Sequence, residues 1–209
     1  MRAGQVKKKT VKPVPQQVRI IGGQWKRTPL AVVDADGLRP TPDRVRETVF
    51  NWLTHVFDGD WAAVKALDLF AGSGALGFEV ASRGAAQVLM IENHAPALRQ
   101  LQAAQEKLQA NQIQIVRGDA LLKLRELAAT KQTFSLIFLD PPYHQEWLQK
   151  TLPLCVALLE PDAYVYAEAE TSLDTHAPWL DGWEIIRADQ AGMVFYHLLR
   201  YGKPSGNQA

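Results

Sequence analysis

Cysteine is almost absent from this chain of 209 residues, where Cys155 stands alone. A single cysteine excludes an internal disulfide framework and a cysteine-based metal site. A nucleophilic thiol needs a neighbouring base and an exposed position, and the apolar surroundings "LPLCVALL" indicate neither. We therefore expect Cys155 in the core of a helix. The scarcity of cysteine also favours a cytoplasmic protein.

Long hydrophobic runs are absent as well, so the sequence predicts no membrane span and no membrane partner. The start, "MRAGQVKKKTVKPVPQQ", is basic with no apolar segment behind it, and we expect no secretory signal there. Its Lys, Gln and Pro content predicts a disordered basic arm over residues 1–17. Hydrophobic residues still make up 47% of the chain, enough for one packed domain with a small extension.

Metal-ligand spacing is missing too. The five histidines share no such spacing: His55, His94, His144, His176 and His197. We therefore expect no metal site.

Charge is unevenly distributed along the chain. Residues 1–46 hold eleven Lys and Arg and three Asp, a net charge of +8, whereas the remainder holds twelve cations and nineteen anions, a net charge of −7. A basic front on an acidic body predicts that a polyanion such as RNA binds the front. The candidate RNA-binding residues on patterned sequence are Lys26, Arg27, Arg39, Arg44 and Arg46.

The front also carries structural patterns. Residues 18–33 read as two short strands around a Gly-Gly turn. A helix should follow, with Thr41 as N-cap and Pro42 in the first helical position. Arg44 and Arg46 lie off its apolar stripe, free to face a ligand or water. That stripe consists of Val45, Val49, Trp52, Leu53 and Val56.

We divide the chain into the arm, an RNA-contacting hairpin and helix over residues 18–60, and a catalytic domain over residues 61–203. Trp25 and Trp52 should pack the hairpin against the helix. In the catalytic domain strands alternate with helices, which predicts an α/β fold with a mostly parallel sheet covered on both faces. The expected strands are 64–70, 86–92, 113–119, 134–140 and 163–170, and the expected helices are 75–83, 95–110, 120–129 and 144–159. Residues 183–201 read as an antiparallel hairpin, which gives seven strands.

A glycine-rich loop follows the first of these strands. In "DLFAGSGALG", Gly72, Gly74 and Gly77 match G-x-G-x-x-G between a strand and a helix. Glu92 ends the second strand, twenty residues after Gly72, where a carboxylate can accept from both hydroxyls of a ribose. The pattern predicts an adenosine-containing cofactor.

Three features favour S-adenosylmethionine over NAD. Asp68, just ahead of the loop, can receive the ammonium of a methionine moiety. Asp119 ends the third strand and can accept from an adenine amino group. The antiparallel hairpin at the end is typical of class I methyltransferases. The candidate cofactor-binding residues are Asp68, Phe70, Gly72, Ser73, Gly74, Glu92, Asn93, Asp119 and Ala120.

The fourth strand ends in "DPPY", residues 140–143, which we call the Pro-Pro corner. An exocyclic amine of a purine is a poor nucleophile unless its N–H donors are held by acceptors. The Asp140 carboxylate and the Pro141 carbonyl are two such acceptors, and Pro142 makes the corner rigid. Tyr143 can stack on a base taken out of its helix.

Three segments in this order, "GLRPTPDRVRETVFNWL", "DLFAGSGALGFEVASRGA" and "DPPY", resemble the RsmD family over residues 18 to about 200. The resemblance implies a Rossmann-like class I methyltransferase that modifies N2 of one guanine in small-subunit (16S) rRNA. It implies that Gly72, Gly74, Glu92 and Asp119 hold S-adenosylmethionine and that the Pro-Pro corner receives the guanine. The expected partner is the rRNA or an assembling 30S particle, and we expect a monomer.

Other functions remain open at this point. An adenine-N6 methyltransferase acting on DNA or RNA would use the same corner. A protein glutamine methyltransferase usually begins its corner with Asn, so Asp140 argues against it. A non-catalytic RNA-binding module would leave the glycine loop and the corner without purpose. An NAD oxidoreductase lacks an evident proton relay beside the corner.

Overall fold

A seven-stranded sheet organises the chain, in the order β5-β4-β3-β6-β7-β9-β8. This computed structural model describes residues 17–33, 42–143 and 145–202. The expected basic arm, the Thr41 cap, Arg39 and His144 lie outside the described residues. The strands of the sheet are β3 (Lys65–Asp68), β4 (Gln87–Glu92), β5 (Ile113–Arg117), β6 (Phe134–Leu139), β7 (Leu159–Ala169), β8 (Trp183–Ala191) and β9 (Val194–Tyr201).

Strand direction follows the connections between the strands. The first five strands of the order are parallel, because a helix lies between each of these strands and the next one along the chain and returns the chain to the same edge. β9 is antiparallel to β7 and to β8, because no helix separates β8 from β9. The predicted mostly parallel sheet with an antiparallel C-terminal hairpin is thereby confirmed.

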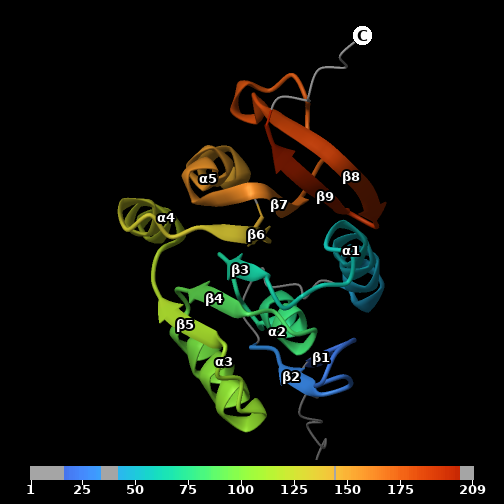
Figure 1. The fold of residues 1–209 in the computed structure, drawn as a ribbon, viewed down its shortest axis with the longest axis vertical. Coiled ribbons are helices and arrows are strands. Elements are labelled where there is room, and N and C mark those ends of the chain that lie inside the picture. The colour runs from blue at the N-terminus through green and yellow to red at the C-terminus, as the bar shows by residue number, and fades with distance from the viewer. Residues whose placement is uncertain (1–16, 34–41, 144, 203–209) are drawn as a thin grey trace, which may run out of the picture.

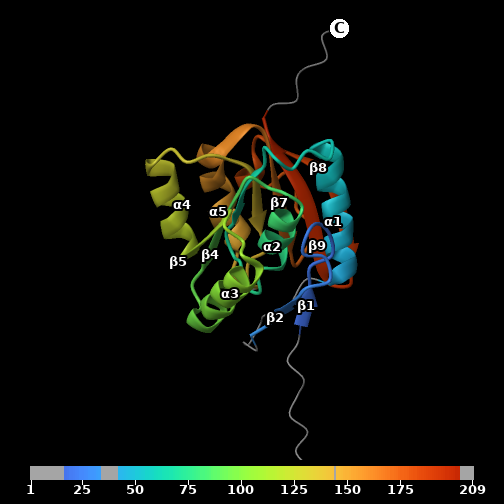
Figure 2. The ribbon, with the colours of Figure 1, turned by 60° about the horizontal axis from the view of Figure 1, so that its bottom comes forward.

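Helices cover both faces of the sheet (Figures 1 and 2). α1, α2 and α3 pack with one face, and α4 and α5 pack with the other, so two hydrophobic clusters form. The helices are α1 (Asp43–Val56), α2 (Ala75–Ser82), α3 (Ala95–Leu108), α4 (Ala120–Ala129) and α5 (Trp147–Cys155); two short 3₁₀ helices are η1 (Val156–Leu158) and η2 (Pro178–Leu180).

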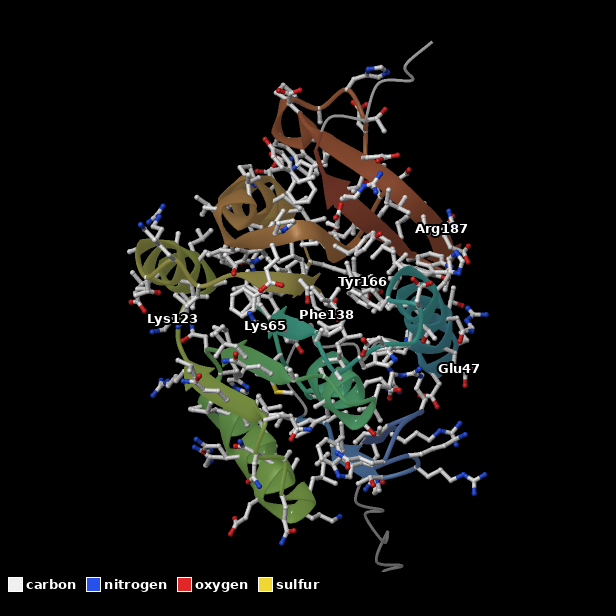
Figure 3. The ribbon with its side chains drawn as sticks, in the orientation of Figure 1. Glu47, Lys65, Lys123, Phe138, Tyr166 and Arg187 are labelled. Atoms are coloured by element: carbon white, nitrogen blue, oxygen red, sulfur yellow. The ribbon has the colours of Figure 1, made fainter. Side chains whose placement is uncertain are left out.

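The central strands are buried on both faces, as their continuous apolar runs require. On β6, Phe138 belongs to the cluster under α1, whereas Ile137 and Leu139 belong to the cluster under α4 and α5. Phe138 packs against Tyr166 of β7 with ring centroids 6.0 Å apart, and both side chains lie toward α1 in Figure 3.

The N-terminal hairpin consists of β1 (Gln17–Arg19) and β2 (Pro29–Ala31), paired antiparallel as predicted. It is seated on α2. The Ile21 N–H donates to the buried Glu79 carboxylate at 2.6 Å, and the Ser82 hydroxyl both accepts from the Trp25 N–H and donates to the Gly22 carbonyl. The hairpin therefore adds to the core of the α1–α3 face.

Trp25 and Trp52 both lie against the hydrophobic cluster that includes hairpin and helix residues, as expected. Trp52 also stacks on Tyr196 of β9, with centroids 5.4 Å apart and an interplanar angle of 29°, a contact that was not predicted. α1 thus bridges the hairpin and the far end of the sheet.

Some boundaries differ from the prediction. α1 has Pro42 as its N-cap residue, so the helix begins one residue later than expected. α5 begins at Trp147 because Glu146 has a φ of 51°, which a right-handed helix cannot continue through. β7 begins at Leu159, four residues earlier than expected. Cys155 is fully buried, as predicted, and burial raises the pKa of its thiol.

Candidate active site

Acidic residues gather where the parallel strands end. Asp68 ends β3, Glu92 ends β4, Asp140 directly follows β6, and Glu168 lies one residue from the end of β7. Because carboxyl ends of parallel strands meet at one edge, these side chains share one edge of the sheet. β6 lies next to β3, so the Pro-Pro corner follows the strand adjacent to the glycine loop.

The glycine loop brings backbone close to this edge. Gly74 is the N-cap residue of α2 with a φ of 77°, a left-handed conformation that favours glycine. A Cβ at Gly74 would lie 2.6 Å from Leu101 and Phe78 side-chain atoms. A Cβ at Gly77 would collide with the side chain of Met90, so the third glycine serves the packing of α2 on β4.

Asp68 is 1% exposed and incompletely satisfied. Its Oδ2 accepts from the Gly77 N–H at 3.1 Å, whereas its Oδ1 has no hydrogen-bond partner within the described residues. Burial raises the pKa of Asp68 to about 7. The hydrogen bond from the Gly77 N–H and a weaker one from the Phe70 backbone partly offset this increase, and the negative charge of Glu92 adds to it. A buried acceptor without a donor is costly in a folded protein, and a ligand ammonium would satisfy it.

Glu92 ties two loops together. Its Oε2 accepts from the Gly72 N–H at 2.7 Å, and its Oε1 accepts from the His94 N–H at 2.6 Å. The carboxylate is partly exposed at the end of β4. Each carboxylate oxygen has two lone pairs, so these bonds leave room for ribose hydroxyls.

Asp119 has a structural role that the sequence analysis did not anticipate. It is the N-cap residue of α4, and its Oδ1 accepts from the Leu122 N–H at 3.0 Å. The side chain is exposed at the same edge as the other acids. The remaining candidates differ in exposure: Phe70 and Ser73 are partly exposed, Asn93 is exposed, and Ala120 is buried.

Phe70 connects the glycine loop to the Pro-Pro corner. Its ring meets Trp147, the first residue of α5, edge-on with centroids 5.3 Å apart. Three residues of the corner line one end of a pocket whose volume is about 360 Å³. This pocket is lined by Pro141, Pro142, Tyr143, Glu146, Trp147, Leu148, Gln149, Glu168, Ala169, Glu170, Thr171, Leu173 and Trp179.

Within the corner the residues differ in exposure. Pro141 is buried, Asp140 and Tyr143 are partly exposed, and Pro142 is exposed. Asp140 lies close enough to Tyr166 for its negative charge to help raise the pKa of that phenol. The corner thus places the Tyr143 ring in the wall of the pocket, three residues after Asp140 in the chain.

The sequence analysis missed Trp147, Trp179 and Glu168 in the pocket wall. Glu168 carried a usable signal, because it lies two residues before the end of the expected strand "AYVYAEAE", much as Asp140 lies at the end of its strand. No sequence signal marked Trp179 as a pocket residue, because it lies in the segment after β7 and comes to the pocket only through the tertiary fold.

The candidate RNA-binding cations fall into different environments. Lys26 and Arg27 are exposed on the hairpin turn, and Arg44 is exposed at the start of α1. The expectation that Arg46 faces a ligand or water is wrong: Arg46 is 0% exposed and donates to the Arg19 carbonyl at 2.8 Å and to Asp43 at 2.6 Å. It joins β1 to α1 and is withdrawn from the surface.

Metal-binding clusters and membrane-spanning helices are both absent from the described ranges. Residues 17–33, 42–143 and 145–202 include no group of three or more His, Cys, Asp or Glu side chains that could hold a metal ion. Within the same ranges, none of the helices combines the length and apolarity needed to cross a bilayer.

The fold is that of a class I methyltransferase. It combines a mostly parallel sheet flanked by helices, a glycine loop after the first strand of the sheet and an antiparallel hairpin at its end. The family model "Conserved hypothetical protein 95" matches residues 18–200, and the chain belongs to this family. "Ribosomal RNA small subunit methyltransferase D" of Escherichia coli K12 is 39% identical over 185 residues, which are 87% of this chain and 89% of that protein.

Two more comparisons agree. The protein of the same name from Haemophilus influenzae is 34% identical over 186 residues, with 87% of this chain and 93% of that protein covered. A solved structure of the Escherichia coli protein yhhF is 36% identical with a TM-score of 0.76, covering 90% of this chain and 99% of that one. The expected fold class and the expected family are confirmed, and the chain is a methyltransferase.

Proposed function

We propose that this enzyme transfers a methyl group from S-adenosylmethionine to N2 of a guanine in small-subunit rRNA, in the cytoplasm. The observation that supports this most directly is the Pro-Pro corner beside the glycine loop, where Asp140 follows the strand next to β3. The 39% identity to a protein named for small-subunit rRNA methylation supports the substrate.

The residues at the strand ends fit the cofactor. The unpartnered Oδ1 of Asp68 suits the ammonium of the methionine part, and the partly exposed Glu92 suits the ribose hydroxyls. The tight backbone at Gly74 lets the start of α2 approach a ligand. When bound, S-adenosylmethionine supplies a methyl group on a positively charged sulfur.

The corner activates the acceptor amine. The Asp140 carboxylate and the Pro141 carbonyl accept hydrogen bonds from the two N–H groups of N2. These hydrogen bonds turn the nitrogen lone pair toward the methyl donor. The bound donor would lose its S–CH₃ bond and leave as S-adenosylhomocysteine, which keeps the electron pair of that bond. The amine becomes acidic as it gains the methyl group, and the Asp140 carboxylate takes its proton. Tyr143 stacks on the base and holds it out of the RNA helix.

Exposed cations place the RNA. Lys26 and Arg27 on the hairpin turn suit phosphate contacts. Arg44 lies near Tyr196 of β9, since its positive charge partly offsets the increase in the pKa of Tyr196 that burial and Asp189 produce. Tyr196 pairs with Glu168 across β7 and β9, so the first turn of α1, which carries Arg44, lies near the strands that carry Glu168.

The direct test identifies the product. The protein is incubated with methyl-labelled S-adenosylmethionine and, in parallel, naked small-subunit rRNA, assembled subunits, tRNA and genomic DNA, and the nucleic acids are digested to nucleosides. We expect labelled N2-methylguanosine from rRNA or subunits. Labelled N6-methyladenine would instead establish the alternative adenine chemistry, and label in neither would refute the proposal. Sedimentation of the protein with its RNA would test the expected monomer.

A further inference from the structure

The pocket beside the Pro-Pro corner has no part in the mechanism above. Its volume is about 360 Å³, and Pro141, Pro142 and Tyr143 form one end of its wall. Asp140, the residue proposed to hold the acceptor amine, does not line it. The place where Asp140 holds the target guanine and the interior of this pocket are therefore two neighbouring positions that share the corner.

Three aromatic side chains from three separate segments line the pocket. Tyr143 belongs to the corner, Trp147 begins α5, and Trp179 lies in η2. All three residues are partly exposed, so a ligand in the pocket can reach each of them. Aromatic side chains are the surfaces on which proteins stack the bases of single-stranded RNA, because every base has a π face.

Both tryptophans are held in place by the fold. The Trp147 ring meets Phe70 edge-on with centroids 5.3 Å apart, and its indole N–H donates to the Gln145 side chain at 3.1 Å. Trp179 packs against the hydrophobic cluster under α4 and α5, in which its neighbour Leu180 is buried. Rings that are already fixed lose little conformational entropy when a ligand binds, which favours binding.

The charge and the size of the pocket restrict its occupant. Three acidic side chains line it, those of Glu146, Glu168 and Glu170, and they would repel a phosphate group. A nucleobase is neutral, and the amino groups of guanine, adenine and cytosine are hydrogen-bond donors. The volume of about 360 Å³ is near the lower end of the roughly 300–1,000 Å³ of small-ligand sites, so the pocket suits one base whose phosphates stay outside.

We propose that this pocket binds the base of a nucleotide adjacent to the target guanine in the same RNA strand. The base stacks on the aromatic wall formed by Tyr143, Trp147 and Trp179, on the far side of the corner from the methyl donor. Capture of this second base fixes the strand on both sides of the corner and so positions the target amine. This inference rests on the proposed function and deepens it, because it assigns a site to a second nucleotide of the substrate.

The test removes the base and the ring separately and then together. Two RNA substrates carry an abasic nucleotide directly 5′ or directly 3′ of the target guanine. For the wild type, one of them should have a kcat/KM at least about tenfold lower than that of the unmodified RNA, which is the order of effect of one stacked base. Trp179→Leu should lower kcat/KM about tenfold on the unmodified RNA. On the sensitive abasic RNA the same variant should lose less than about twofold, because the partner of the ring is already absent.

Trp183→Leu is the matched control. Trp183 is also partly exposed, but it lies outside the pocket and packs edge-on against Tyr201 with centroids 5.2 Å apart. Its substitution should leave kcat/KM within about twofold on all three RNAs. Trp179→Phe keeps a ring and should recover most of the activity. Unchanged affinity of Trp179→Leu for S-adenosylhomocysteine would show that the variant is folded.

The outcomes distinguish this inference from the proposed function. The inference is overturned if neither abasic RNA is a poorer substrate for the wild type, or if Trp179→Leu behaves as the wild type on the unmodified RNA. It is also overturned if Trp179→Leu loses equally on all three RNAs, since the pocket would then hold the target base or a group from another molecule. Each of these results leaves the proposed function intact when the wild type forms N2-methylguanosine. Absence of N2-methylguanosine from every wild-type reaction overturns the proposed function, and this inference with it.

Discussion

Among single residues, Asp140 is the one whose loss should damage catalysis most. Asp140→Ala removes the carboxylate proposed to orient the amine and to take its proton, so kcat should fall by about 100-fold or more. Affinity for S-adenosylhomocysteine should stay within about threefold, which calorimetry measures. Asp60→Ala, an exposed aspartate before β3 at the opposite edge of the sheet, is the control. Near-normal methyl transfer by Asp140→Ala would refute the role of this carboxylate.

Removal of the charge from two neighbouring arginines should affect different properties of the protein, namely its stability and its binding of RNA. Arg46 is buried and bonded to Asp43 and the Arg19 carbonyl, so Arg46→Met should lower the free energy of unfolding by about 2–4 kcal/mol. Arg44 is exposed, so Arg44→Met should change stability by less than about 0.5 kcal/mol while weakening RNA binding. Urea unfolding and RNA titration of both variants measure this. Equal stability of the two variants would contradict the assignment.

These arginines also show where periodicity stops being informative. Arg44 and Arg46 both lie off the apolar stripe of α1, and the stripe alone cannot tell them apart. The hairpin covers one side of α1 and supplies the Arg19 carbonyl as an acceptor, so Arg46 becomes buried. That neighbour depends on a tertiary contact which no local pattern encodes.

Asp68 should give the protein a measurable pH dependence. Its pKa rises from 3.8 to about 7 on folding, so the folded chain keeps a proton that the unfolded chain releases. Below about pH 4 the protonated Asp68 makes its full contribution to the free energy of unfolding. This contribution is lost as the pH rises to about 7, and the loss is up to about 4 kcal/mol. Asp68→Asn cannot ionise, so it should gain stability relative to the wild type over this range.

Urea unfolding of both proteins at several pH values from 4.5 to 7.5 measures the difference. Parallel stability curves would mean that Asp68 titrates normally in the folded protein. The same variant should bind S-adenosylhomocysteine more weakly at pH 8, because the proposed partner of the ligand ammonium has lost its charge.

At the scale of elements, the contact between the N-terminal hairpin and α2 can be tested by alanine substitution of two glycines. Gly23 and Gly59 have φ of 70° and 73°, so Ala imposes similar backbone strain at both. A Cβ at Gly23 would collide with the Ser82 carbonyl, whereas a Cβ at Gly59 meets nothing within 4 Å. Gly59→Ala should cost about 1 kcal/mol, and Gly23→Ala should cost clearly more and loosen the hairpin.

Hydrogen exchange of residues 17–33, together with urea unfolding, reports this loosening. Faster exchange in the hairpin of Gly23→Ala, with the rest of the sheet unchanged, is the expected result. Equal effects of the two substitutions would mean that the hairpin does not depend on its contact with Ser82.

The elements themselves were largely predictable. The alternation of apolar segments and amphipathic segments along the sequence predicted each strand of the sheet and each helix that covers it. Burial of a strand on two faces requires a run of apolar residues, which is easy to recognise. The starts of α5 and β7 were not predictable. The start of α5 depends on the left-handed conformation of Glu146, and the start of β7 depends on the pairing of Leu159 with Phe134 of β6. The glycine loop and the Pro-Pro corner were recognisable because their residue types are dictated locally.

At the scale of the whole molecule, strand order decides which distant residues meet. Asp140 and Glu168 become neighbours only because β6 and β7 pair, and Arg44 comes near Tyr196 only because α1 reaches β9. The sequence predicted a ligand site at the carboxyl edge from the parallel topology. It could not predict that Glu168 would lie beside Asp140, because that depends on the pairing of β6 with β7.

The uneven charge of the chain leads to a prediction about RNA binding. Lys26 and Arg27 are exposed on the hairpin, against α2 on one face of the sheet, whereas Arg125 and Lys131 are exposed on and after α4, which covers the other. Each phosphate contact contributes roughly 0.7–0.9 to the slope of log affinity against log salt. The double variant Lys26→Gln, Arg27→Gln should therefore lower that slope by about 1.4–1.8 when RNA binding is titrated between 50 and 200 mM salt. Turnover at saturating RNA should stay within about twofold, because these residues lie outside the pocket. The double variant Arg125→Gln, Lys131→Gln removes the same charge and should leave the slope unchanged; equal losses in the two variants would mean that RNA is attracted by overall charge and not held at the hairpin.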